Sequence, residues 1–139
     1  MSLTYACLSS IIQNTPPDLY QLVYVDNGTR LDSFHHLLKN FPNVQYVRLP
    51  FNHGSVRAIN AGLALSLLSP SEYVVLLDND TEIPRGDNQW LTRFMSYFEV
   101  EEVGAAGAVS DYVSGTQQTE VAPDTYTKDW QEDDGRAGV

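Results

Sequence analysis

The sequence predicts an α/β fold with a mostly parallel sheet and helices on both faces of that sheet. Segments with apolar residues at helical spacing alternate with short segments rich in β-branched and aromatic residues. One short segment, residues 73–77, is an uninterrupted apolar run, which is typical of a strand buried on both faces of a parallel sheet. The 139 residues are enough for one domain but would be cramped for two.

Each element follows from its local pattern and from the residues that end it. The expected elements are a helix over residues 5–14, a strand over 19–25, a helix over 31–41, a strand over 44–49, a helix over 55–68, a strand over 72–78, a helix over 88–99 and a strand over 104–109. Prolines at 16, 17 and 42 end the first two helices, and Ser55 is the expected N-cap of the third. We expect residues 4–110 to form the α/β core and residues 111–139 to be a polar, acidic and irregular segment, the whole being a single domain or a domain fragment.

Composition excludes several classes of protein. The net charge of −10 disfavours nucleic acid as a partner, because binding its phosphates needs clustered lysine and arginine. No apolar run approaches the roughly 20 residues that cross a bilayer, so we expect no transmembrane segment. The single cysteine, Cys7, rules out an internal disulfide and is expected to be a buried packing residue. We expect a cytoplasmic protein, with peripheral attachment to the cytoplasmic face of the membrane as an alternative.

The acidic residues gather in the second half of the chain, and two of them follow the apolar run. Residues 72–139 carry 15 of the 18 acidic side chains. Asp78 and Asp80 leave the end of an expected strand, the edge at which parallel sheets bind ligands. Two carboxylates there suit Mg²⁺ or Mn²⁺, which complete their coordination with substrate phosphates. The alternative is an ordinary turn, since Asp and Asn side chains readily bond nearby backbone.

Two further loops lie at the same expected edge. Asp26 and Asn27 follow the first strand, where a carboxylate can accept hydrogen bonds from a nucleobase or a ribose. The alternative is that Asp-Asn-Gly only makes a turn with positive φ. Gly54 precedes the third helix and would let the backbone approach an anion such as a diphosphate, to which Arg57 could add a charge-assisted bond. The segment is not a P-loop, because it lacks the Gly-Lys-Ser/Thr ending.

Three blocks occur in a characteristic order. They are Leu-Val-Tyr-Val-Asp-Asn-Gly-Thr at 22–29, Asn-His-Gly-Ser-Val-Arg-Ala-Ile-Asn-Ala-Gly at 52–62 and Tyr-Val-Val-Leu-Leu-Asp-Asn-Asp-Thr-Glu-Ile-Pro at 73–84. This order resembles the family-2 glycosyltransferases over about residues 5–110. The resemblance implies the GT-A fold, which is Rossmann-like and binds nucleotide-diphospho sugars.

The resemblance also implies roles for these residues. Asp26 and Asn27 would lie against the nucleobase, and Gly54 and Arg57 would border the nucleotide. The Asp78-Asn79-Asp80 motif would meet the ribose and the diphosphate, with Asp78 and Asp80 holding a divalent cation, Mn²⁺ or Mg²⁺. The activity implied is transfer of a sugar, usually with inversion, from a nucleotide-diphospho-sugar donor to a glycan, lipid or other acceptor. Polysaccharide biosynthesis is one such role.

The sequence departs from the family pattern at both ends. Family members place a strand before the first helix, and this sequence starts at the helix, so we expect a truncated domain. The catalytic base normally comes later than the acids of 132–134, which read as a solvated loop, so we expect the base to lie outside this chain. Trp130 could cover a sugar face or pack locally. A sheet without its central strand would expose an edge, through which two copies of the chain could pair.

Two other readings compete with a glycosyltransferase. Asp78 could be the nucleophile of a haloacid-dehalogenase-type phosphatase, but that motif comes early in its domain and ends in glycine, where Thr81 stands here. The other alternative is a catalytically incomplete nucleotide-binding or interaction module derived from a glycosyltransferase.

Overall fold

The computed structural model describes residues 2–108. The chain divides into two compact units that separate between Ser96 and Tyr97. The first unit contains α1 (Leu3–Asn14), the 3₁₀ helix Pro17–Leu19, β1 (Val23–Asn27), α2 (Leu31–Asn40), β2 (Gln45–Leu49), α3 (Ser55–Ser66) and α4 (Trp90–Ser96). The described part of the second unit begins with the 3₁₀ helix Tyr97–Glu99. No helix in the described part of the chain combines the length and the apolar character needed to cross a membrane.

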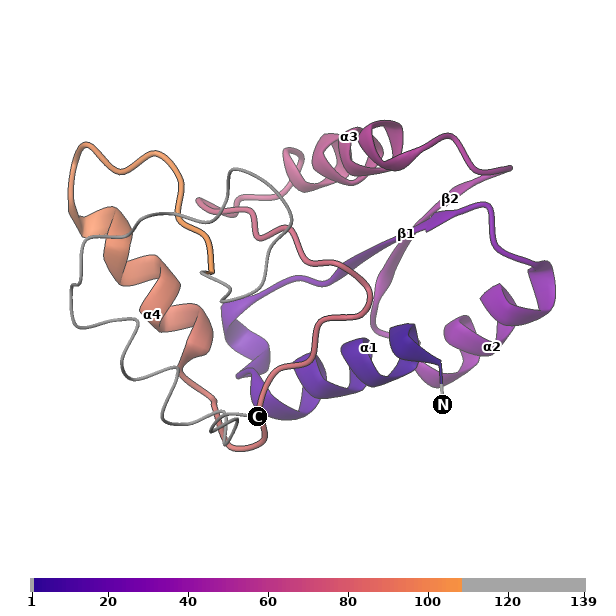
Figure 1. Ribbon diagram of the computed structural model, residues 1–139, viewed down its shortest axis with the longest axis horizontal. Coiled ribbons are helices and arrows are strands. Elements are labelled where there is room, and N and C mark those ends of the chain that lie inside the picture. Colours follow the sequence, from indigo (N-terminus) through magenta and orange to yellow (C-terminus); the bar gives the residue numbers. More distant parts are fainter. Residues whose placement is uncertain (1, 109–139) are drawn as a thin grey trace, which may run out of the picture. The chain divides into compact units, whose positions relative to one another are not determined.

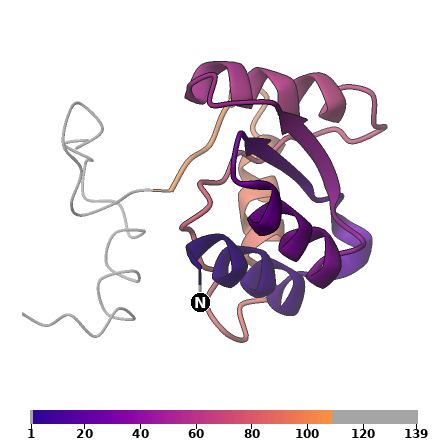
Figure 2. The same ribbon diagram turned by 90° about the vertical axis from the view of Figure 1, so that its right-hand side faces the viewer.

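The first unit is layered around a parallel sheet of two strands. β1 and β2 pair in parallel, with Tyr24 opposite Tyr46 and Asp26 opposite Arg48. Helix α3 covers one face of the pair, and α1 and α2 lie on the other (Figures 1 and 2). A Cβ at Gly62 would lie 2.9 Å from Val25 Cγ2, so this glycine lets α3 approach β1 closely. The arrangement confirms the predicted α/β class with a parallel sheet and helices on both faces.

Helix α1 separates two apolar clusters. On one side Leu8 packs with Leu37 of α2 and with Phe41, which follows this helix, and Tyr24 and Tyr46 of the sheet pack against this cluster. On the other side α1 contributes to a second cluster that includes the start of α4; its buried members are Cys7, Ile11, Ile83, Trp90 and Leu91. Cys7 is 5% exposed, as predicted for a packing residue. The core therefore forms around α1 as well as around the sheet.

Element boundaries differ from the prediction where proline and glycine act. The first strand begins at Val23 rather than at 19, because Pro17 starts a 3₁₀ helix before it. Asp26 and Asn27 are consequently the last two residues of β1, not the turn after it. The N-cap of α3 is Gly54, with φ of 81°, so Ser55 is the first helical residue rather than the predicted N-cap.

The predicted strand over 72–78 is wrong. No strand is assigned there, and the described sheet consists of β1 and β2 alone. The apolar residues from Val74 to Leu77 are 40–61% exposed rather than buried on two faces. An apolar run becomes a buried parallel strand only where a partner strand and covering helices meet it, and local sequence does not supply either.

Two predictions near the division between the units are also wrong in part. The helix expected over 88–99 is α4 followed by the separate 3₁₀ helix. The strand expected over 104–109 is absent from 104–108, whose residues are exposed, and residue 109 lies outside the described part. Alanines and glycines dominate that stretch, and they bury too little surface to fix a strand without a partner.

Candidate functional site

Strands β1 and β2 end at one edge of the sheet, and two loops leave from it. The loop after β1 begins at Gly28, and the loop after β2 leads to Gly54 and α3. A Cβ at Gly28 would lie 2.3 Å from the backbone carbon of Phe51, and Gly28 has φ of 84°. Only glycine satisfies both conditions, because a side chain would need the left-handed conformation and would meet backbone that cannot give way. The two loops are therefore in direct contact.

Asp26 is fully buried and ion-paired. Its side chain is 0% exposed, and Oδ2 accepts a hydrogen bond of 2.6 Å from Arg48 Nη1. Its Oδ1 accepts from the backbone N–H of Thr29 at 3.0 Å, and Arg48 Nη2 donates to the Thr29 carbonyl at 2.9 Å. The Arg48 guanidinium also lies 4.5 Å from the centre of the Phe34 ring. Aspartate and arginine together hold Thr29, the second residue of the loop after β1.

Sequence reasoning did not find Arg48, although a signal exists. The two strands carry the same pattern, Tyr-Val-Asp at 24–26 and Tyr-Val-Arg at 46–48. In parallel register the tyrosines lie opposite each other, and so do the two opposite charges. The pattern predicts the Asp26–Arg48 ion pair only once the register of the strands is known, because a shift by one residue would place the two charges on different faces of the sheet.

Asn27 joins the two loops through its side chain. Its Nδ2 donates to Asn52 Oδ1 at 3.1 Å and to the Gly54 carbonyl at 3.3 Å, and its Oδ1 accepts from the His53 N–H at 2.9 Å. Asn52 Oδ1 also accepts from the Gly54 N–H at 2.9 Å. We call Asn27, Asn52, His53 and Gly54 the amide cluster. Two predicted site residues, Asn27 and Gly54, are thus brought together.

Arg57 lies in the first turn of α3, next to the amide cluster. Its side chain is exposed. No side chain caps the amino end of α3, so the first backbone N–H groups of this helix are directed outward with the partial positive charge of a helix start. Arg57 and these N–H groups give the start of α3 a positive potential.

The Asp78–Asp80 loop lies beside α1. The Thr81 N–H donates to the Asp78 carbonyl at 3.1 Å, which closes a turn. Asn79 points back to the protein, where its Nδ2 donates to Thr4 Oγ1 at 3.0 Å. Asp78 and Asp80 are exposed, and neither is ion-paired within the described residues. The middle residue of the motif is therefore an anchor, and the two carboxylates stay available.

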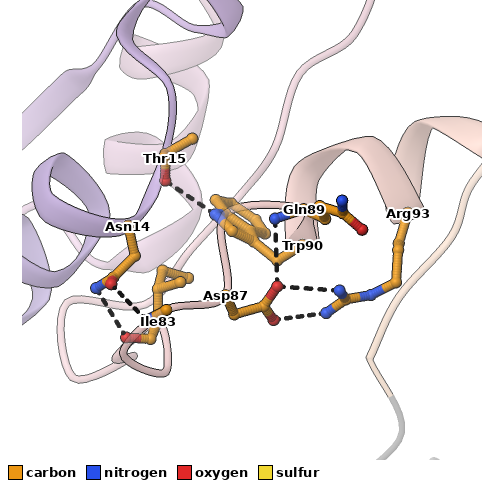
Figure 3. Close-up of polar contacts among 8 residues, drawn as sticks. Asn14, Thr15, Ile83, Asp87, Gln89, Trp90 and Arg93 are labelled. Carbon is orange, nitrogen blue, oxygen red and sulfur yellow. Dashed lines mark hydrogen bonds and ion pairs between the residues drawn. The ribbon is translucent and has the colours of Figure 1, made fainter.

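A row of polar side chains on α1 holds the segment around this loop. Cys7 Sγ donates to the Asp78 carbonyl at 3.7 Å, and Ser10 Oγ accepts from the Ile83 N–H at 3.0 Å. Asn14 Nδ2 donates to the Ile83 carbonyl at 3.4 Å, a bond drawn in Figure 3. Asn14 Oδ1 accepts from the Gly86 N–H at 3.0 Å. The row was not predicted, although its spacing of three and four residues is a signal, because it places these side chains on one helix face.

Thr4 connects the loop to the sheet. Burial raises the pKa of the Tyr24 phenol, and a hydrogen bond with Thr4 opposes that rise. Thr4 also receives the Asn79 amide, so its hydroxyl lies between β1 and the Asp78–Asp80 loop. Burial likewise raises the pKa of the Cys7 thiol, and the charges of Asp80 and Glu82 add to that rise. These carboxylates therefore lie near the first two turns of α1.

The donor chemistry of Asp78 and Asp80 fits a hard divalent cation. Both offer exposed oxygen ligands, which Mg²⁺ and Mn²⁺ prefer. Residues 2–108 contain no cluster of three or more His, Cys, Asp or Glu side chains arranged to hold a metal. The pair thus suits a cation that takes its other ligands from water and substrate phosphate. The predicted acids at 132–134, and Trp130, lie outside the described residues.

Comparison with known proteins assigns the family. No curated protein and no solved structure gives a match. The family model described as glycosyl transferase family 2 matches residues 2–137. A match over nearly the whole sequence, with the parallel α/β arrangement, shows that the chain belongs to glycosyl transferase family 2.

Proposed function

We propose that this chain binds a nucleotide-diphospho sugar and takes part in transferring its sugar, with inversion, to a glycan, lipid or other acceptor. Membership of the family supports glycosyl transfer in general. The observation that carries the finer proposal is the Asp78–Asp80 loop, because its central Asn79 is tied to Thr4 while both carboxylates remain exposed and without an ion pair in the described chain. Such a pair can meet a diphosphate through a divalent cation.

The proposal divides the donor between two sets of residues. Asn27 borders the nucleobase, and Gly54 and Arg57 border the rest of the nucleotide. Because both oxygens of Asp26 are occupied by Arg48 and Thr29, we propose that Asp26 acts on the base through the loop that it holds. Asp78 and Asp80 face the ribose and the diphosphate, and Asn79 holds the loop that carries them against Thr4.

Asp78 and Asp80 would hold Mn²⁺ or Mg²⁺. When bound there, the cation supplies positive charge that stabilises the departing nucleoside diphosphate. The Asn79–Thr4 bond orients the two carboxylates outward, and Arg57 adds a second positive group for phosphate. Pairing of two copies of the chain through an exposed edge of the sheet stays a prediction.

Calorimetry tests the donor site directly. We expect at least one of UDP, GDP and dTDP to bind the complete chain, and to bind more tightly with Mn²⁺ than without it. Absence of binding by all three would contradict the proposal. If a donor binds but the chain transfers no sugar to any acceptor, the result favours the nucleotide-binding module without catalysis.

Asp80→Ala tests the cation. Because Asp80 is exposed, we expect the free energy of unfolding to change by less than about 0.5 kcal/mol. The increase in nucleotide affinity caused by Mn²⁺ should disappear. Asp18→Ala, which removes another exposed carboxylate in the 3₁₀ helix Pro17–Leu19, is the matched control and should retain the Mn²⁺ effect. An unchanged Mn²⁺ effect in Asp80→Ala would show that the cation binds elsewhere.

A further inference from the structure

Phe51 is an exposed aromatic residue with one covered face. It lies in the loop after β2, and 62% of its surface is exposed. The His53 ring lies against it, with ring centres 4.0 Å apart and planes inclined by 27°. The histidine ring covers one face of the phenylalanine ring, in the stacked geometry that aromatic pairs favour, and most of the Phe51 side chain is exposed.

The backbone on either side of this ring is fixed. The backbones of Gly28 and Phe51 lie in close contact, since a Cβ at Gly28 would come within 2.3 Å of the Phe51 backbone. The His53 N–H donates to Asn27 Oδ1, which fixes the backbone of the residue that carries the supporting ring. The ring pair is therefore held between the end of β1 and the start of α3. A rigid aromatic surface loses little conformational entropy when a ligand covers it.

We propose that Phe51, supported by His53, is the surface on which the nucleobase of the donor stacks. The inference rests on the proposed function, which already places the nucleotide beside Asn27 and Gly54. A nucleobase is flat and has a π face, so it suits a ring whose other side is backed by a second ring. Because stacking does not read hydrogen-bonding groups, Phe51 contributes affinity for any base. Discrimination between bases falls to the polar residues of the two loops.

Calorimetry on the complete chain with Mn²⁺ tests the stacking, with UDP, GDP and dTDP as nucleotides and inorganic pyrophosphate as a ligand without a base. We expect Phe51→Ala to weaken the nucleotide that binds by about 5- to 100-fold. Pyrophosphate affinity should change by less than about twofold, and Phe51→Trp should bind the nucleotide at least as tightly as the unmodified chain. Leu19→Ala, which truncates another exposed apolar side chain before β1, should change neither affinity.

Three outcomes would overturn the inference. Phe51→Ala could bind the nucleotide within twofold of the unmodified chain, or it could lose nucleotide and pyrophosphate equally, which would indicate a disturbed loop rather than a lost base contact. If the unmodified chain binds pyrophosphate as tightly as every nucleotide, no base contact exists. The first two results leave the proposed function standing, whereas the third also removes the base contact proposed for Asn27. Failure of the unmodified chain to bind any of the three nucleotides overturns both proposals.

Discussion

The two halves of the candidate site are held in place by different forces. The loops after β1 and β2 are tied by a buried ion pair, Asp26–Arg48, and by the amide cluster, on a framework of paired strands. The Asp78–Asp80 loop does not follow a strand in the described chain. Neutral hydrogen bonds between α1 and residues 78–83 hold it, several of them partly exposed. The first half is fixed through charge and sheet, and the second through one helix.

This difference matches what each half is proposed to do. A flat nucleobase is recognised best by a rigid surface, because the loops then lose little freedom on binding. A divalent cation instead brings its own geometry and can draw two carboxylates into position. The comparison therefore predicts that substitutions in the first half cost more folding free energy than equivalent substitutions in the second.

The largest effect is expected from Arg48→Met. Its partner Asp26 is 0% exposed, so the substitution leaves a buried carboxylate without its counter-charge. We expect the free energy of unfolding, measured by urea denaturation, to fall by about 3–5 kcal/mol. The double variant Asp26→Leu with Arg48→Met should recover part of this loss, because no charge then stays buried. A loss below about 1 kcal/mol in Arg48→Met would class the pair with surface ion pairs.

A pair of glycines compares the loop after β1 with the segment that follows the Asp78–Asp80 loop. Gly28 has φ of 84° and Gly86 has φ of 82°. A Cβ at Gly28 would meet the Phe51 backbone at 2.3 Å, whereas one at Gly86 would meet nothing within 4 Å. By urea denaturation we expect Gly86→Ala to cost about 1 kcal/mol, from the positive φ alone, and Gly28→Ala to cost about 2–4 kcal/mol. Equal losses would mean that the Phe51 backbone gives way to the added methyl group, and that the loops after β1 and β2 are not held together.

The same contrast explains what the sequence could predict. Helices such as α2 and the strand β2 were predictable because their periodicity and the prolines that follow are local signals. The carboxylates of Asp78 and Asp80 were also predictable as an exposed pair, because an acidic motif after an apolar run is visible in the sequence. Their relation to α1 was not, since the hydrogen bond of Cys7 with the Asp78 carbonyl and that of Asn79 with Thr4 join residues 71 and 75 positions apart.

Two failures have the same physical origin. The apolar run at 73–77 is a good strand by composition, but pairing depends on what lies beside it. Asp26 looked like an open acceptor at the end of a strand, and its pairing with Arg48 depends on the register of β1 and β2. Local sequence specifies which residues are available at the edge of a sheet. It does not specify which of them are already paired by the fold.

The smallest effect is expected from Asp87→Asn, in the segment between the Asp78–Asp80 loop and α4. Arg93 donates to both oxygens of Asp87 and holds the pKa of this carboxyl below its ordinary value of 3.8 (Figure 3). A depressed pKa stabilises the fold above the ordinary pKa, and this contribution is lost as the pH falls through the folded value. Because Arg93 is about half exposed, we expect Asp87→Asn to cost less than about 1 kcal/mol at pH 7. Asparagine keeps an oxygen for the Gln89 N–H, so the change isolates the ion pair.

The pH dependence of this loss distinguishes the ion pair from a general effect of charge. Urea denaturation at pH 7 and at pH values below 3.8 should show the difference between Asp87→Asn and the unmodified chain shrinking as the pH falls, because the native carboxyl then becomes neutral as well. Asp32→Asn is the matched control, since its 3.9 Å contact with Arg30 joins two side chains that are 88–90% exposed. It removes the same charge and should cost less than about 0.5 kcal/mol, from the carboxylate in the first turn of α2. A loss in Asp87→Asn that persists unchanged at low pH would mean that packing, and not the ion pair, fixes the start of α4.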